Sequence, residues 1–109
     1  MSGTVSRQTP LPVALEGSLD FNTVPDLRKN LLKTLRKGAS PSIELDFSRV
    51  SKVDTSGIAM LVELNRIAVS KGGNVSLTGM NEQVRRMMRL ARLDGIFSLE
   101  DVGGVGLEP

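Results

Sequence analysis

The clearest hydrophobic pattern in the chain lies between residues 43 and 73, where the spacing of the apolar positions changes once. Ile43, Leu45 and Phe47 alternate with polar residues, which is typical of a strand with one buried face. Further on, the spacing becomes helical, at Ile58, Leu61, Val62, Asn65 and Ala68, of which only Asn65 is polar. Between the two patterns lies Asp54-Thr55-Ser56-Gly57, where we expect a strand to turn into a helix at a polar corner.

The segment before this region predicts a strand and then a helix. Pro12–Asp20 has the apolar spacing of a strand, and Gly17 within it favours a bulge or a bend. Asn22 or Thr23 is placed to cap a helix that has Pro25 in its first turn. The residues that define this helix are Leu27, Leu31 and Leu35 at i+4 spacing, the cations Lys33, Arg36 and Lys37 near its end, and Gly38 as its C-terminal cap.

The segment after the central region predicts a further strand and a further helix. Val75–Gly79 alternates like a short strand, Asn81 is placed to cap a helix, and Asp94-Gly95 is expected to end it. The apolar stripe of this helix consists of Val84, Met87, Met88 and Ala91. A final short strand is expected within residues 96–102.

This alternation of strands and helices predicts one α/β domain over residues 1–109. We expect a mixed sheet of about four to five strands, at least partly parallel, with about three to four helices packed on it. The core spans about residues 12–102, between a polar arm or edge strand at 1–10 and a Gly-rich tail at 103–109.

Composition narrows the class of function. Lys and Arg number 14 against 12 Asp and Glu, and the resulting net charge of +2 is too small to indicate nucleic acid as a partner. The chain has no Cys and no His, which removes thiol nucleophiles, imidazole bases and most metal sites. It also has no long apolar run and no signal-peptide pattern. We therefore expect a cytoplasmic protein with no cofactor, no metal and no direct membrane insertion.

The polar corner at residues 54–57 allows two interpretations. Asp, Thr and Ser are preferred N-cap residues, so starting the helix accounts for one or two of them. The other interpretation is regulatory, because a phosphoryl group on Thr55 or Ser56 would meet free backbone N–H groups and the positive end of the helix dipole. Its added charge of about −1.5 to −2 would repel or reshape a partner surface. The residues alone leave both interpretations open.

Four segments of the chain match a known domain family: Leu15–Asp20, Ser48–Ala59, Gly72–Leu77 and Val84–Met87. Over Pro12 to Val102 the chain resembles the STAS domain family. The resemblance implies a STAS-type α/β fold and a non-enzymatic module that binds a protein partner. The binding surface that it implies consists of Asp54, Thr55, Ser56, Gly57 and Met60.

The resemblance implies two alternative partner systems. In the anti-sigma factor antagonists, the unphosphorylated STAS protein binds an anti-sigma factor that is often a serine/threonine protein kinase. Phosphorylation of the hydroxyl residue after the motif Asp breaks that complex. Our first hypothesis is this switch, with Thr55 as the acceptor and Ser56 as the second candidate. The antagonists most often have Ser at that position, and this chain has Thr.

The alternative is the cytoplasmic STAS subunit of the lipid-transport ABC complex that maintains outer-membrane asymmetry. That subunit has Thr at the corner, in the surface that contacts its ATPase. Ser48–Ala59 and Asn74–Gly79 are similar to it. A homodimer is left open in both cases.

Two further sets of residues are candidate sites. The arginines Arg85, Arg89 and Arg92, at i, i+4 and i+7 of the last helix, form either a solvated face or a patch for an anionic partner. The carboxylates nearest the corner are Asp46, Asp54 and Glu63. No spacing places two of them on one face beside a nucleophile, so the sequence predicts no enzyme.

Overall fold

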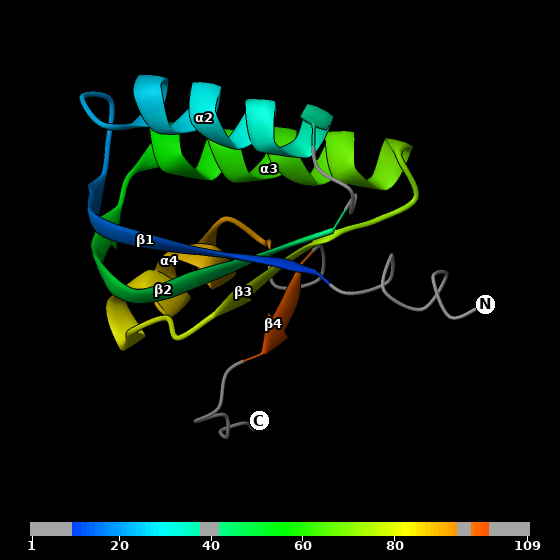
Figure 1. Ribbon diagram of the computed structural model, residues 1–109. Coiled ribbons are helices and arrows are strands. Elements are labelled where there is room, and N and C mark those ends of the chain that lie inside the picture. Colours follow the sequence, from blue (N-terminus) through cyan, green and yellow to red (C-terminus); the bar gives the residue numbers. More distant parts are fainter. Residues whose placement is uncertain (1–9, 38–41, 94–96, 101–109) are drawn as a thin grey trace.

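Strands and helices alternate along the chain in this computed structural model, which describes residues 10–37, 42–93 and 97–100 (Figure 1). The elements are β1 (Leu11–Leu19), α2 (Val24–Lys37), β2 (Ile43–Val53), α3 (Thr55–Ser70), β3 (Val75–Thr78), α4 (Glu82–Leu90) and β4 (Ser98–Glu100). The predicted order of elements is confirmed from β1 to β4, including the corner that separates β2 from α3. The arm or edge strand expected at the N-terminus and the tail expected at 103–109 fall on residues 1–9 and 101–109, outside the described residues. α2 ends at Lys37, and its predicted cap Gly38 lies outside the described residues. The predicted end of the last helix at Asp94-Gly95 is wrong, because α4 already ends at Leu90.

The four described strands form one sheet in the order β1-β2-β3-β4, and every pairing is parallel. Each pair of neighbouring strands is joined through a helix, which brings the second strand back in the same direction. The predicted α/β architecture is confirmed. The predicted mixed sheet is not found in the described residues, where the pairings are parallel throughout. The carboxyl ends of the strands therefore meet at one edge of the sheet.

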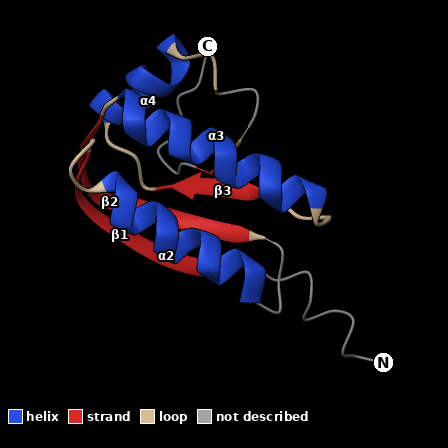
Figure 2. Ribbon diagram, turned by 90° about the horizontal axis from the view of Figure 1, so that it is seen from above, coloured by secondary structure: helices blue, strands red, loops and turns tan. Residues whose placement is uncertain are grey.

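Two of the three described helices form a layer over the sheet, and the third lies apart from it (Figure 1). α2 and α3 lie side by side over the strands, and α4 lies away from this pair, next to β2 (Figure 1 and Figure 2). Beneath the layer, Ile43, Leu45 and Phe47 of β2 are buried in alternation with partly exposed polar residues, as predicted. These side chains belong to one continuous core cluster.

β1 is irregular at the predicted glycine. Its register against β2 shifts between Ala14 and Glu16 and again between Gly17 and Ser18. Gly17 has a φ of +80°, which other residues rarely adopt. Such bulges increase the local twist of a strand. β1 then ends at the buried Leu19, beside the corner.

Asn81 caps α4 as predicted and also ties it to β2. Its Oδ1 accepts from the backbone N–H of Val84 at 2.8 Å, and its Nδ2 donates to the carbonyl oxygens of Val50 and Ser51 at 3.2 and 3.3 Å. The predicted apolar stripe is only partly buried. Val84 and Met88 lie in the core and Met87 is half-buried. The fourth member of the stripe, Ala91, is exposed because the helix has already ended at Leu90.

Gly57 lets the first turn of α3 pack directly on the end of β1. The backbone N–H of Asp54 donates to the carbonyl oxygen of Leu19 at 3.0 Å, which fixes the start of the helix there. A Cβ atom at position 57 would lie 2.7 Å from Cγ1 of Val53 and 3.1 Å from both the Cβ and the carbonyl oxygen of Leu19. Space, rather than an unusual backbone angle, therefore requires glycine at this position.

We expect Gly57→Ala to lower the free energy of unfolding by about 1–3 kcal/mol, because the added methyl group overpacks the contact with β1. In an open helix the same change stabilises by up to about 1 kcal/mol, so the sign of the effect tests the contact. Urea denaturation measures it. Asn30→Ala on the exposed surface of α2 is the control and should change stability little. A Gly57→Ala protein as stable as the wild type would contradict the close packing.

An ion pair joins the two helices of the upper layer. Arg28 of α2 donates from Nε to Oε1 of Glu63 at 2.6 Å and from Nη2 to Oε2 at 2.7 Å, so the ion pair is bidentate. These hydrogen bonds lower the pKa of Glu63, against the opposing effect of partial burial. The side chains are 45% and 36% exposed, so solvent screens the pair and its contribution to stability is small.

The lowered pKa of Glu63 predicts a pH-dependent contribution to stability. The contribution is present above the ordinary glutamate pKa of about 4.3 and is lost as the pH falls through the lower value of the folded state. Glu63→Gln should therefore lower the melting temperature at pH 7 by no more than a few degrees, and the difference from the wild type should vanish in acid. Thermal denaturation across this pH range measures it. A difference that persists below both pKa values would assign the effect to packing instead.

Candidate functional site

The corner between β2 and α3 is held by a single carboxylate. Oδ1 of Asp54 accepts from the backbone N–H groups of Ser56 at 2.7 Å and Gly57 at 3.3 Å, which satisfies two donors of the first helical turn. Its carbonyl oxygen accepts from the N–H of Ile58 at 3.0 Å. Asp54 therefore performs the capping role alone, whereas the sequence offered Asp54, Thr55 and Ser56 as candidates.

The two hydroxyl groups that follow Asp54 are left available by this arrangement. Thr55 is exposed and Ser56 is half-buried. Neither hydroxyl forms a hydrogen bond within the described part of the chain, because Asp54 already supplies the cap. The regulatory or contact interpretation of the corner thus falls on Thr55 first and on Ser56 second. Their modification remains a prediction.

Two of the five residues expected at the binding surface lie inside the protein. Gly57 is buried against Leu19 and Val53, and Met60 is 2% exposed in the core. Met60 follows Asp54 by six positions on the inward face of α3, so its side chain cannot reach a partner in this structure. The expected direct contact by Met60 is therefore corrected to a packing role beneath the corner.

The loop between β1 and α2 is built by a second short network of polar groups. Oδ1 of Asp20 accepts from the N–H groups of Asn22 at 2.9 Å and Thr23 at 3.1 Å, and these bonds, Asn22 first, lower the pKa of Asp20. The Thr23 hydroxyl donates to the carbonyl oxygen of Ser18 at 2.7 Å and accepts from the N–H of Asp20 at 3.0 Å. The Thr23 side chain thus bonds back into the loop instead of capping α2. The loop is ordered before any partner arrives.

This loop presents an aromatic residue that the sequence analysis did not identify. Phe21 is 71% exposed, although large aromatic side chains are usually buried at least in part. The loop lies at the same edge of the sheet as the corner, since Leu19 just before it accepts from the N–H of Asp54 (Figure 1). The signal that could have identified it is a lone aromatic residue in a polar turn between a strand and a helix.

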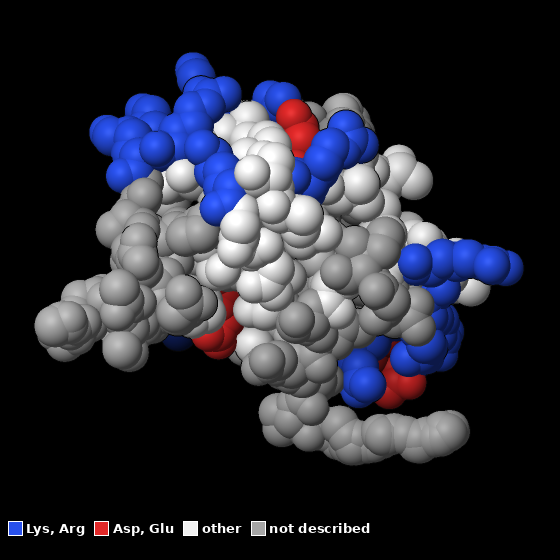
Figure 3. All heavy atoms as spheres, turned by 90° about the vertical axis from the view of Figure 1, so that its right-hand side faces the viewer, with Lys and Arg blue, Asp and Glu red and all other residues white. Residues whose placement is uncertain are grey.

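Other predicted sites are not brought together. α4 ends at Leu90, and Arg92 lies beyond it in a turn with a φ of +61°, so Arg85, Arg89 and Arg92 do not share one helix face. The Lys and Arg side chains on the face shown in Figure 3 form separate groups rather than one patch.

The carboxylates considered for catalysis are engaged separately. Asp54 caps α3, and Glu63 pairs with Arg28. Asp46 accepts from the N–H of Ser48 at 2.9 Å, and this bond lowers the pKa of Asp46. None of the described helices is long and apolar enough to cross a membrane.

Comparisons with known proteins identify the family of this chain. A family model described as "Mlab, STAS domain" matches residues 3–101. The chain is 38% identical over 95 residues to the intermembrane phospholipid transport system binding protein MlaB of Escherichia coli K12, covering 85% of this chain and 93% of that protein. It is 25% identical over 101 residues to the anti-sigma-B factor antagonist of Bacillus subtilis 168, covering 91% of each.

Solved structures share the fold. The unphosphorylated anti-sigma factor antagonist SpoIIAA superimposes with a TM-score of 0.74 at 25% identity, covering 86% of this chain and 82% of that one. A putative anti-sigma factor antagonist from Thermotoga maritima has a TM-score of 0.76 at 28% identity, covering 84% and 80%. The resemblance noted in the sequence is confirmed: the chain belongs to the STAS domain family.

Proposed function

We propose that this protein is the STAS binding subunit of an intermembrane phospholipid transport system, and that it acts in the cytoplasm without catalysis by binding the ATPase of an ABC complex. The observation that carries the proposal is the 38% identity to MlaB over nearly the whole of both chains. The exposed Thr55 hydroxyl, at the start of α3, supplies the contact point.

The geometry of the corner suits a rigid binding surface. Asp54 holds the first turn of α3, Gly57 packs it onto β1, and Asp20 orders the neighbouring loop. Binding therefore costs little conformational entropy in this protein. A small polar residue at Thr55, with the exposed Phe21 in the loop at the same edge of the sheet, matches the composition of protein interfaces, in which aromatic residues are enriched and charges are depleted at the centre.

The second candidate function is that of an anti-sigma factor antagonist switched by phosphorylation. The observation that favours it is the unbonded hydroxyl at a helix N-terminus, where a phosphate is well accommodated. The added charge would then release a kinase-type partner by repulsion. The 25% identity to the anti-sigma-B factor antagonist also supports it, over a similar share of the chain.

We expect Thr55→Glu to weaken binding to the transport ATPase by tenfold or more, because an uncompensated charge would enter the centre of the interface. The fold should persist, since a carboxylate is favourable at a helix N-terminus. Surface plasmon resonance with the purified ATPase measures the affinity. Thr55→Ser should retain binding, and Asn30→Glu on α2 controls for net charge. Unchanged affinity in Thr55→Glu would remove the corner from the interface.

The two candidate functions differ in whether the hydroxyl groups of the corner are phosphorylated in the cell. For the transport subunit we expect the intact mass of the protein from its native host to be that of the unmodified chain, with the ATPase co-purifying. A phosphoryl group on Thr55 or Ser56, together with a kinase-type anti-sigma factor as the bound protein, would instead establish the second candidate.

A further inference from the structure

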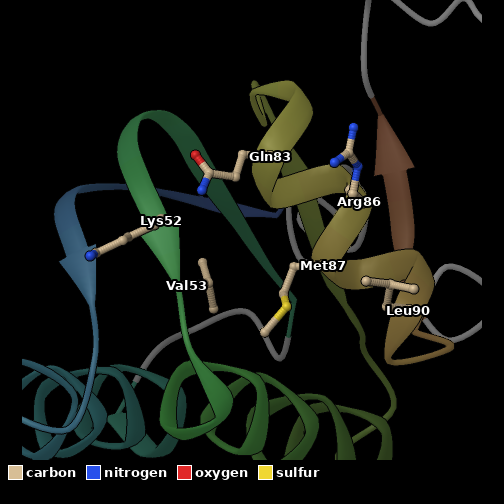
Figure 4. Close-up of a pocket in the computed structure, with 6 residues that line it drawn as sticks. All are labelled: Lys52, Val53, Gln83, Arg86, Met87 and Leu90. Carbon is tan, nitrogen blue, oxygen red and sulfur yellow. The ribbon is translucent and has the colours of Figure 1, made fainter.

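A groove of about 350 Å³ opens between the end of β2 and one face of α4 (Figure 4). Its walls come from two elements that are far apart in the sequence. The lining residues are Lys52, Val53, Gln83, Arg86, Met87 and Leu90. Val53 directly precedes the corner, so the groove lies beside the site described above without including Thr55.

The groove exists because β2 is longer than its neighbour β3. Pairing between the two strands ends at Asp46 and Thr78, whereas β2 continues to Val53. Along this extension β2 lies next to α4 instead of next to β3. Asn81, which caps α4, donates hydrogen bonds to the carbonyl oxygens of Val50 and Ser51. The residues that line the groove come from β2 and α4 alone.

The floor of the groove consists of apolar side chains that are not needed to pack the hydrophobic core. α4 already buries Val84 and Met88 against the sheet. Met87 and Leu90 form a second apolar row one step around the helix, and Leu90 remains 74% exposed. In Figure 4, Val53 and Met87 lie opposite each other across the gap between strand and helix. A single exposed leucine is ordinary, but here it continues an apolar floor.

The rim of the groove is positively charged. Lys52 stands on β2 and Arg86 on α4, and both are exposed. Neither forms an ion pair with a described carboxylate, and no Asp or Glu is among the lining residues. Two unpaired cations beside apolar side chains favour a ligand that carries both negative charge and a bulky apolar group.

We propose that this groove is a second protein contact, and that it receives an acidic segment of a partner with a leucine-like side chain seated between Val53, Met87 and Leu90. Its volume lies at the lower end of ligand sites and suits one or two side chains. The segment binds as an amphipathic helix laid in a groove, with its carboxylates toward Lys52 and Arg86. The lining combines two cations, one amide and three apolar side chains, which suits a peptide better than a lipid tail.

The experiment is a titration of the ¹⁵N-labelled protein, followed by amide chemical shifts. The probe is a synthetic amphipathic peptide of about 15 residues with leucines at helical spacing flanked by glutamates. The comparison peptide has lysines in place of the glutamates. We expect the acidic peptide to shift the amides of Val53, Met87 and Leu90, and the lysine peptide to leave them unchanged.

Matched variants test whether the peptide binds at the residues of the groove. Lys52→Glu combined with Arg86→Glu should weaken the acidic peptide by about tenfold or more, the size expected for lost close charge pairs, and should make the lysine peptide bind. Leu90→Ser should also weaken binding of the acidic peptide, because it removes an apolar contact and leaves the charges unchanged. Lys29→Glu combined with Lys33→Glu changes the net charge equally on exposed positions of α2 and should have no effect. Thr55→Glu should also leave peptide binding intact, which separates this proposal from the function proposed for the corner.

Three results would overturn the proposal. The acidic peptide could leave the groove amides unshifted up to millimolar concentration, or the α2 control could weaken it as much as the groove variant. The third is that monomeric lysophosphatidylglycerol shifts the groove amides and the acidic peptide does not, which would assign the groove to a lipid.

Discussion

The first turn of α3 lies so close to the end of β1 that no side chain fits at position 57. A Cβ atom there would fall 2.7 Å from Val53 and 3.1 Å from Leu19. This contact, together with the bond from the N–H of Asp54 to the carbonyl oxygen of Leu19, joins the ends of two parallel strands to the start of a helix. The placement of the surrounding loops depends on it, because each begins or ends at one of these residues.

Two features of the surface follow from this constraint. The corner and the β1–α2 loop meet at the carboxyl edge of the sheet, where parallel α/β proteins commonly bind their ligands. Thr55 and Phe21 are therefore presented by a backbone whose polar groups are already satisfied. The groove depends on the same strand. β2 extends to Val53, directly before the corner, and is therefore longer than β3.

The sequence predicted the features that depend on local spacing. The change of period after Phe47, the bulge at Gly17 and the cap at Asn81 are visible in neighbouring residues alone. It did not predict features that depend on distant segments. The burial of Met60 follows from the packing of α3 on the core, the all-parallel pairing from the order of the strands, and the groove from the unequal lengths of β2 and β3. Only the contact with β1 reveals why position 57 needs glycine.

The corner suits both kinds of relative equally well, because a cap by Asp54 and a hydroxyl at the next position serve a phosphate acceptor and a neutral contact alike. What distinguishes a partner is the surface around the corner, since specificity depends on repulsion as much as on attraction. Here that surface places an exposed aromatic ring in the β1–α2 loop and the cations Lys52 and Arg86 beside an apolar floor next to β2. A basic partner surface would be repelled at Lys52 and Arg86 whatever it contacted at Thr55. We therefore propose that the surface beside the corner determines which partner binds, and that the corner itself determines only whether the complex forms.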